Sequence, residues 1–198
     1  QYDNFVGVQV NGLIKQVLNA NAPSTAGANP YMVTYSMHSR KTGWGIRAGI
    51  GYNYNSNSNT GTFSDNTVKN NDLQLRAGVE KYFVLSKKWS LEAGVDIVLN
   101  NINDNSTSGQ YYSDTIINAT KTLYTSYGGG PFGVISYHIS DRVMIGTEAN
   151  MYFRTGTRNQ TIDYTKKYLN GYLPPVISET KSNPTNTGVV INLPVVLY

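Results

Sequence analysis

Seven charged side chains could act together, because each falls on the polar side of an alternating stretch of sequence. They are Arg47, Arg76, Arg154, Glu80, Glu92, Asp96 and Glu148. Successive side chains of a strand point to opposite faces, so residues an even number apart share a face. If such strands closed into a cylinder, these charges would meet in its interior, where unpaired charges are costly. The pattern predicts a self-neutralising network of ion pairs, and a proton or ion path is the alternative.

Other chemistry finds little support in the residue types. Glu92 and Asp96 share a face and could do acid/base work, but beside Arg76 they read first as salt-bridge partners. The chain has no cysteine, which removes disulfides, thiolate nucleophiles and cysteine metal sites. Asn103-Asp104-Asn105 lacks the spacing of an EF-hand loop. We therefore expect no catalytic residues, no cofactor and no metal site.

The elements that would position the charges are clearest between residues 73 and 100. The apolar side chains alternate with polar or small ones in two arms, Leu73 to Phe83 and Trp89 to Leu99, joined by Leu85-Ser86-Lys87-Lys88. This two-residue period indicates strands rather than a helix. An apolar stripe of about 9–11 residues is also the length that a tilted strand needs to cross a bilayer.

Imperfect copies of this pattern recur along the chain, giving about eight strands. The expected strands are 2–18, 31–38, 44–54, 73–83, 89–100, 122–139, 143–154 and 187–198. Turns of a few residues alternate with long polar loops, expected at 19–29, 55–71, 100–121 and 155–186. Gly128-Gly129-Gly130-Pro131 is expected to mark a bulge or a kink, and Pro194 a bulge, because Gly and Pro disturb a ladder.

The predicted fold is all-β, a single domain over residues 1–198. It is an eight-stranded antiparallel up-and-down transmembrane β-barrel with short periplasmic turns and long extracellular loops. Aromatic residues near the strand ends would form girdles at the two membrane interfaces: Tyr31, Trp44, Tyr52, Tyr54, Phe83, Trp89, Tyr137 and Phe153. No apolar run approaches the ~18 residues of a transmembrane helix.

Charge and the start of the sequence bound the partners and the location. The net charge is +4 and the basic residues are spread out, which argues against nucleic-acid binding. No basic region followed by an apolar run stands near Gln1, so we expect that a signal peptide has already been removed.

The chain resembles the small OmpA/OmpX-type barrels, in particular the porin-family outer-membrane proteins of Bacteroidota. The resemblance rests on the units 43–55 and 73–100, on Gly130-Pro131-Phe132, and on the ending 189–198. It implies residence in the outer membrane of a Gram-negative bacterium, with lipopolysaccharide and phospholipid around the barrel. It also implies a signal for the barrel-assembly machinery in Leu193, Val195, Leu197 and Tyr198.

Further features suggest partners outside the barrel. Tyr164, Tyr168 and Tyr172 in the longest expected loop are suited to recognition, since Tyr offers large contact area at low entropic cost. Asp114-Thr115-Ile116 is similar to the O-glycosylation motif of Bacteroidota, which would place a glycan on Thr115.

The expected function is that of a non-enzymatic structural or interaction protein, working through its loops or as an accessory subunit of an envelope complex. An outer-leaflet lipid-modifying enzyme and a small-solute pore are the alternatives, and a soluble lipocalin-like carrier is the competing fold. His138-Ile139-Ser140 is similar to the His-x-Ser of lipid A deacylases, but it abuts a turn expected to be periplasmic. Polar residues at the membrane interface are the simpler interpretation.

Overall fold

The computed structural model describes residues 1–9, 31–111, 115–168, 171–172, 176–182, 188–192 and 195–198, and these are almost entirely strand. The strands are β1 (Tyr2–Gln9), β2 (Tyr31–Ser39), β3 (Trp44–Thr60), β4 (Ser64–Val84), β5 (Trp89–Tyr111), β6 (Thr115–His138), β7 (Met144–Tyr168), β8 (Gly171–Tyr172), β9 (Val176–Ser182), β10 (Gly188–Asn192) and β11 (Val195–Leu197).

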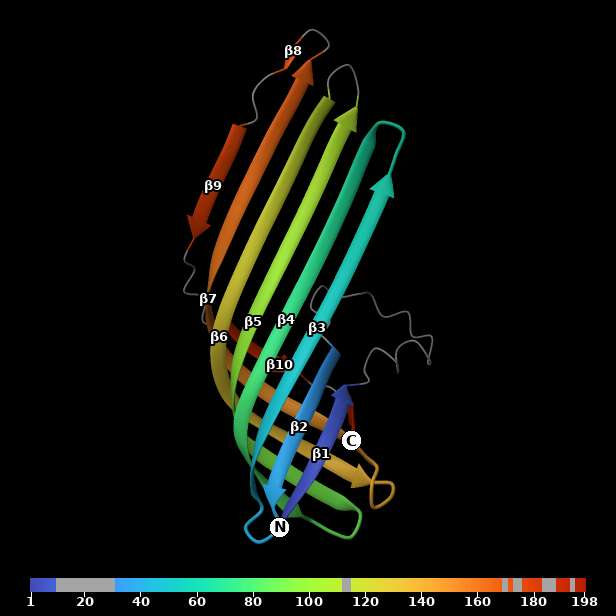
Figure 1. Ribbon diagram of the computed structural model, residues 1–198, viewed down its shortest axis with the longest axis vertical. Coiled ribbons are helices and arrows are strands. Elements are labelled where there is room, and N and C mark those ends of the chain that lie inside the picture. The colour runs from blue at the N-terminus through green and yellow to red at the C-terminus, as the bar shows by residue number, and fades with distance from the viewer. Residues whose placement is uncertain (10–30, 112–114, 169–170, 173–175, 183–187, 193–194) are drawn as a thin grey trace.

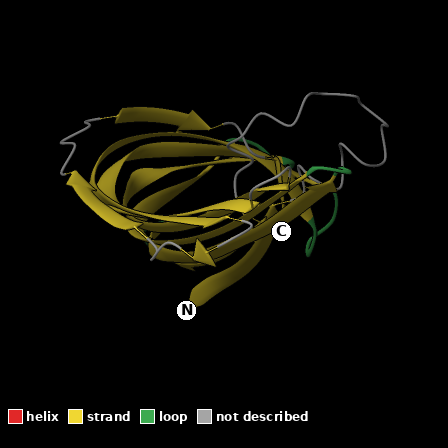
Figure 2. Ribbon diagram, turned by 90° about the horizontal axis from the view of Figure 1, so that it is seen from above, coloured by secondary structure: helices red, strands yellow, loops and turns green. Residues whose placement is uncertain are grey.

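Eight antiparallel strand positions, which we call staves, close into a ring. Strands β1 to β7 pair in sequence order, and both β10 and β11 pair with β7, so that together they make the eighth stave. The ring closes where Val8 and Gln9 of β1 pair with Leu197 and Val196 of β11. Seen from above, the strands curve round a common interior (Figure 2). The predicted all-β, eight-stranded, up-and-down arrangement is therefore confirmed.

The strands from β3 to β7 continue far beyond the ring as a tall curved sheet (Figure 1). β3 and β4 stay paired up to Thr60 and Asp65, and β5 and β6 up to Tyr111 and Thr115. β9 adds a further strand along β7. We call this part the extension: the described residues within 55–71, 101–125 and 155–182.

The extension corrects the predicted long loops. Residues 55–71 and 100–121 were expected to be polar loops, and their described residues are strand apart from a short turn at 61–63. The expected loop 155–186 instead contains the upper half of β7, then β8 and β9. The expected loop 19–29 and the end of the first strand, 10–18, lie outside the described residues.

Side chains alternate between the outside and the interior of the ring as predicted. On β3, Ile46 and Ile50 are exposed and Arg47 is buried; on β7, Ile145 is exposed and Glu148 is buried. Apolar side chains also enter the interior, among them Val98, Phe132 and Val134. The interior is thus a mixed core of ionised, hydroxyl and apolar groups.

Of the bulge or kink predicted in β6, the bulge is absent, because the register across residues 129–132 does not shift. Gly129 pairs with Phe153, and Phe132 pairs with Asn150, so the same number of residues separates the pairs on both strands. Only the pairs between them are absent, since Pro131 has no N–H to donate. A Cβ on Gly130 would lie 2.0 Å from the Met151 carbonyl oxygen, so this glycine permits close approach of β7. The bulge expected at Pro194 lies outside the described residues.

Candidate functional site

A buried ion network joins strands that are not neighbours in the ring. Arg47 on β3 places Nη2 3.0 Å from Asp96 Oδ2 and 3.0 Å from Glu148 Oε1. Arg76 on β4 places Nη1 2.5 Å from the same Glu148 oxygen. All four side chains are at most 4% exposed. Two guanidinium groups thus balance two carboxylates, and they link β3, β4, β5 and β7 through the interior.

Neutral groups add hydrogen bonds to this network, although Arg47 Nη1, Asp96 Oδ1 and Glu148 Oε2 have no partner among the described residues. Arg76 donates from Nη2 to Thr34 Oγ1 at 2.6 Å, and Asn150 donates to Glu148 at 2.9 Å. Tyr152 donates its hydroxyl proton to Asp96 Oδ2 at 2.7 Å. Such partners are what a buried ion pair needs to offset the loss of hydration. The arrangement is suited to holding strands together.

The aromatic ring of Phe132 also supports the network. The Arg47 guanidinium carbon lies 3.5 Å from the centre of this ring, which is cation–π geometry. Phe132 is buried on β6, directly after Pro131. A further strand of the ring, β6, therefore contacts Arg47.

Two of the predicted members, Glu80 and Glu92, do not pair with an arginine. Glu80 instead contacts His38, with Oε1 2.7 Å from the imidazole Nε2. Among the described residues Glu92 makes no ion pair and neither of its carboxylate oxygens has a hydrogen-bond partner. Both glutamates lie closer to the short turns than Arg47 and Arg76 do. Glu80 pairs with Gly45, which is nearer to the turn than Arg47, and with Gly94, which is two residues from Glu92. The ion pairs found thus join Arg47, Arg76, Asp96 and Glu148, and Glu80 and Glu92 lie outside them.

The third predicted cation, Arg154, lies at the upper mouth of the ring. Its guanidinium stands 5.5 Å from the Tyr152 ring centre, and no ion pair to it is found among the described residues. Asp72 lies nearby, just above the apolar stripe of β4. Burial raises the pKa of this carboxyl, Arg154 opposes that rise and Asp104 adds to it.

His138 takes part in a cluster of hydrogen bonds that does not include Ser140. Its Nε2 lies 3.0 Å from Ser90 Oγ and 3.3 Å from the Tyr82 hydroxyl. Ser140 is exposed in the turn, where its Oγ accepts a hydrogen bond from the Arg142 N–H at 3.3 Å. His138 and Ser140 therefore make different contacts, and the resemblance to His-x-Ser finds no support in this geometry.

The aromatic residues predicted as girdles are placed mainly on the outside of the ring. Trp44, Tyr52, Tyr54, Phe83, Trp89 and Phe153 are all exposed by 43% or more. Tyr137 is half-buried, and its ring packs edge-on against Trp89 at 5.0 Å. The side chain of Tyr31 lies outside the description.

The end of the chain forms one side of the ring closure. Leu197 is exposed and pairs with Val8, whereas the Tyr198 ring packs over Gly7, where an added Cβ would lie 2.5 Å away. Tyr198 also exchanges two backbone hydrogen bonds with Met144. Val195 lies on β11 without a described side chain, and Leu193 lies outside the described residues.

The residues expected to meet partners are in the extension. Thr115 begins β6 at the far end of the extension and pairs with Lys167. Tyr164 is exposed on β7, while Tyr168 and Tyr172 belong to β7 and β8. These tyrosines were expected on a loop, and the structure places them on strands.

The contacts that the sequence did not predict are those of His38 and the neutral partners Thr34, Asn150 and Tyr152. Their inward parity was visible, but a contact across the ring depends on strand tilt and stagger, which alternation does not encode. Gly45, between His38 and Glu80, was the one available signal, because a residue without a side chain leaves room for a neighbour's.

Within the described residues, no helix is long and apolar enough to cross a membrane. Comparisons with protein-family models, with curated proteins and with solved structures gave no match.

Proposed function

We propose that the protein is a non-enzymatic integral outer-membrane β-barrel whose lumen is filled by side chains. It acts as a structural or interaction protein through the extension, alone or as an accessory subunit of a larger envelope complex. The short turns would face the periplasm and the extension would face the outside of the cell.

The observation that carries the proposal is the reversed polarity of the ring. Val95, Ile97 and Ile50 are 54%, 69% and 54% exposed, whereas Glu80, Asp96 and Glu148 are 0% exposed. A water-soluble protein buries apolar groups and rarely exposes large contiguous apolar patches. In a bilayer the same arrangement is favourable, because lipid solvates the outer face.

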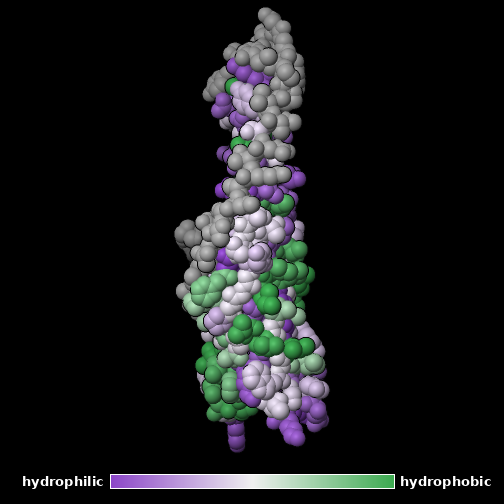
Figure 3. Space-filling model, turned by 90° about the vertical axis from the view of Figure 1, so that its left-hand side faces the viewer, coloured by the Kyte–Doolittle hydropathy of each residue, from purple (hydrophilic) through white to green (hydrophobic). Residues whose placement is uncertain are grey.

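The apolar residues also form a belt of limited height. The belt consists of residues 44–54 on β3, 73–83 on β4, 89–99 on β5 and 145–153 on β7. These spans are close to the 9–11 residues of a tilted transmembrane strand. On the face drawn in Figure 3 the hydrophobic colour gathers over the lower part, and the extension above it is mostly hydrophilic.

A filled interior supports a structural role over a pore. A ring of about eight strands is just wide enough for its side chains to fill. Here Arg47, Asp96, Glu148 and Tyr152 are each at most 2% exposed and contact one another across the interior. We therefore expect little or no ion conductance.

The test uses the whole chain purified from membranes. We expect it to require detergent for solubility and to migrate faster on unheated than on heated SDS gels, as a folded barrel does. In planar bilayers it should give no stepwise conductance. A chain that stays monomeric and folded without detergent would overturn the membrane assignment, and regular single-channel steps would overturn the filled lumen.

A further inference from the structure

The structure points to a site that the sequence did not predict: we infer that His38, Glu80 and Glu92 bind one divalent transition-metal ion, with Zn²⁺ the best match. The three residues come from β2, β4 and β5. One ligand atom from each lies within 4.8 Å of the other two. All three side chains are buried, at 3%, 0% and 1% exposure.

The charges around these residues leave a negative excess. Among the described residues the buried cations are Arg47 and Arg76; Arg47 is paired with Asp96 and Glu148, and Arg76 with Glu148. Glu80 and Glu92 are thus left with His38, which carries at most one positive charge. A doubly positive ion beside a neutral imidazole would balance the two carboxylates completely.

The unmet bonding capacity of the side chains points the same way. Neither carboxylate oxygen of Glu92 has a hydrogen-bond partner among the described residues, although the side chain is 1% exposed. His38 Nε2 and Glu80 Oε1 lie 2.7 Å apart, but neither atom has a hydrogen-bond partner of good geometry among the described residues. A buried, unpaired carboxylate is strongly unfavourable, so a ligand at this position would be held firmly.

The donor set selects the class of ion. One imidazole nitrogen and two carboxylate oxygens are common ligands of Zn²⁺, at about 2.0–2.2 Å, with water in the fourth position. Ca²⁺ prefers six to eight oxygens and Mg²⁺ a nearly ideal octahedron with several waters. In a tetrahedral site ligand atoms stand about 3.4 Å apart, so side-chain rotation within the present 4.8 Å spacing is sufficient.

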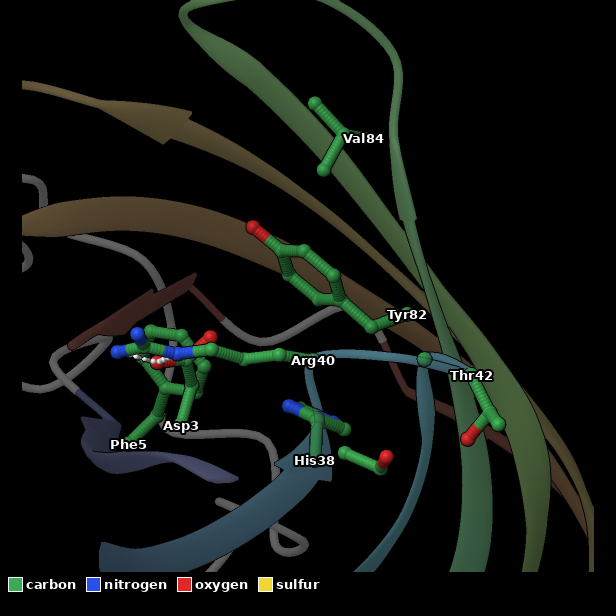
Figure 4. A pocket seen from close by; sticks show the side chains of 9 residues that line it. Asp3, Phe5, His38, Arg40, Thr42, Tyr82 and Val84 are labelled. Atoms are coloured by element: carbon green, nitrogen blue, oxygen red, sulfur yellow. Dashed lines mark hydrogen bonds and ion pairs between the residues drawn. The ribbon is translucent and has the colours of Figure 1, made fainter. Parts of the chain in front are cut away.

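The surroundings hold the imidazole in place, and a pocket adjoins it. The His38 ring packs against those of Phe5 and Tyr82, at centroid distances of 5.6 and 5.2 Å, and these two rings also stack on each other at 6.0 Å. It packs over Gly45, where a Cβ would lie 2.4 Å from the ring. A pocket of about 260 Å³ opens beside it at the short-turn end, and the Asp3–Arg40 pair lies on its wall (Figure 4).

The experiment measures Zn²⁺ binding to the folded protein in detergent after EDTA treatment and dialysis. We expect about one tightly bound ion per chain, and a higher temperature for the gel-mobility change when Zn²⁺ is present, because an ion that binds only the folded state stabilises it. Glu92→Gln and His38→Gln should each weaken binding by about a hundredfold or more, beyond the effect typical of an outer-shell contact. His138→Gln, a nearby histidine outside the cluster, should bind as the unmodified protein does.

Absence of Zn²⁺ binding by the unmodified protein would overturn the inference. So would binding that persists unchanged in both Glu92→Gln and His38→Gln. If those variants do not fold, Co²⁺ is added to the unmodified protein instead. The intense visible absorption of tetrahedral Co²⁺ with nitrogen and oxygen ligands supports the site, and the weak spectrum of hydrated Co²⁺ refutes it.

Discussion

Arg47 and Glu148 are separated by 101 residues in the chain and meet at 3.0 Å in the middle of the ring. Glu148 also accepts hydrogen bonds from Arg76 and Asn150. Glu148 and Asp96 together therefore balance the charges of the two buried arginines. This carboxylate is the residue whose loss should disturb the interior most.

Replacing Glu148 by Gln should destabilise the folded ring by about 3–5 kcal/mol, because it leaves an uncompensated buried charge. Urea unfolding in detergent measures the loss. Asp3→Asn is the control: it breaks the exposed Asp3–Arg40 pair and should cost about 0–1 kcal/mol. Adding Arg76→Met to Glu148→Gln should recover part of the stability. An equal small effect of both single changes would contradict the role of Glu148.

A lysine at Val95 should impair membrane assembly, since Val95 is 54% exposed near the middle of the belt. The expected cost is about 2–4 kcal/mol, as for lysine on a lipid-facing strand near the bilayer midplane. Val68→Lys is the matched control, because Val68 is 41% exposed on the extension and would remain in water. Folded yield in lipid vesicles compares the two. Equal yields would argue that lipid does not cover the belt.

Asp72→Asn should stabilise the protein at neutral pH. The pKa of Asp72 is raised in the folded state, so its ionisation costs stability once the pH exceeds the unfolded value of 3.8. The variant lacks this cost and should gain stability between mildly acidic and neutral pH. Below about pH 3.8 the advantage should disappear, because the carboxyl is then protonated in both states. Unfolding series at several pH values test this, and a loss of stability at neutral pH would show that attraction to Arg154 outweighs burial.

Shortening the extension should remove partner binding and leave the ring intact. Residues 56–69, 105–121 and 161–179 can each be replaced by a short turn. All three cuts lie at the same height of the sheet, because their end residues pair with one another: Lys69 with Asn105, Asn105 with Lys121, Lys121 with Thr161, and Thr161 with Glu179. The heat-dependent gel shift should persist, and proteins that copurify from detergent extracts of membranes should be lost. Partners retained by the shortened chain would transfer the interaction to the barrel wall.

The sequence predicted which side chains of the belt point outward, because apolar residues alternate with polar or small ones, as in Ile46, Arg47, Ala48 and Gly49. The extension could not. Its residues, such as 55–60, are Asn, Ser and Thr, so they show no apolar alternation, and Asn has a low strand preference. Their strands continue ladders begun in the belt, so pairing with a neighbour overrides local preference.

The candidate sites were predictable to a similar degree. Parity placed Arg47, Arg76 and Glu148 inward, but only the stagger of the staves decides which of them meet. Glu80 and Glu92 were expected to face arginines for this reason. The ring instead sets them at the level of His38, where no arginine reaches them among the described residues.

The described ladders between neighbouring strands differ greatly in length. β5 and β6 share a ladder from Trp89 to Tyr111, whereas the described contact of β1 with β11 amounts to Val8–Leu197 and Gln9–Val196. Local opening starts where the fewest bonds must break. Among the ladders formed by the described residues, the one between β1 and β11 is therefore where local opening of the cylinder would begin.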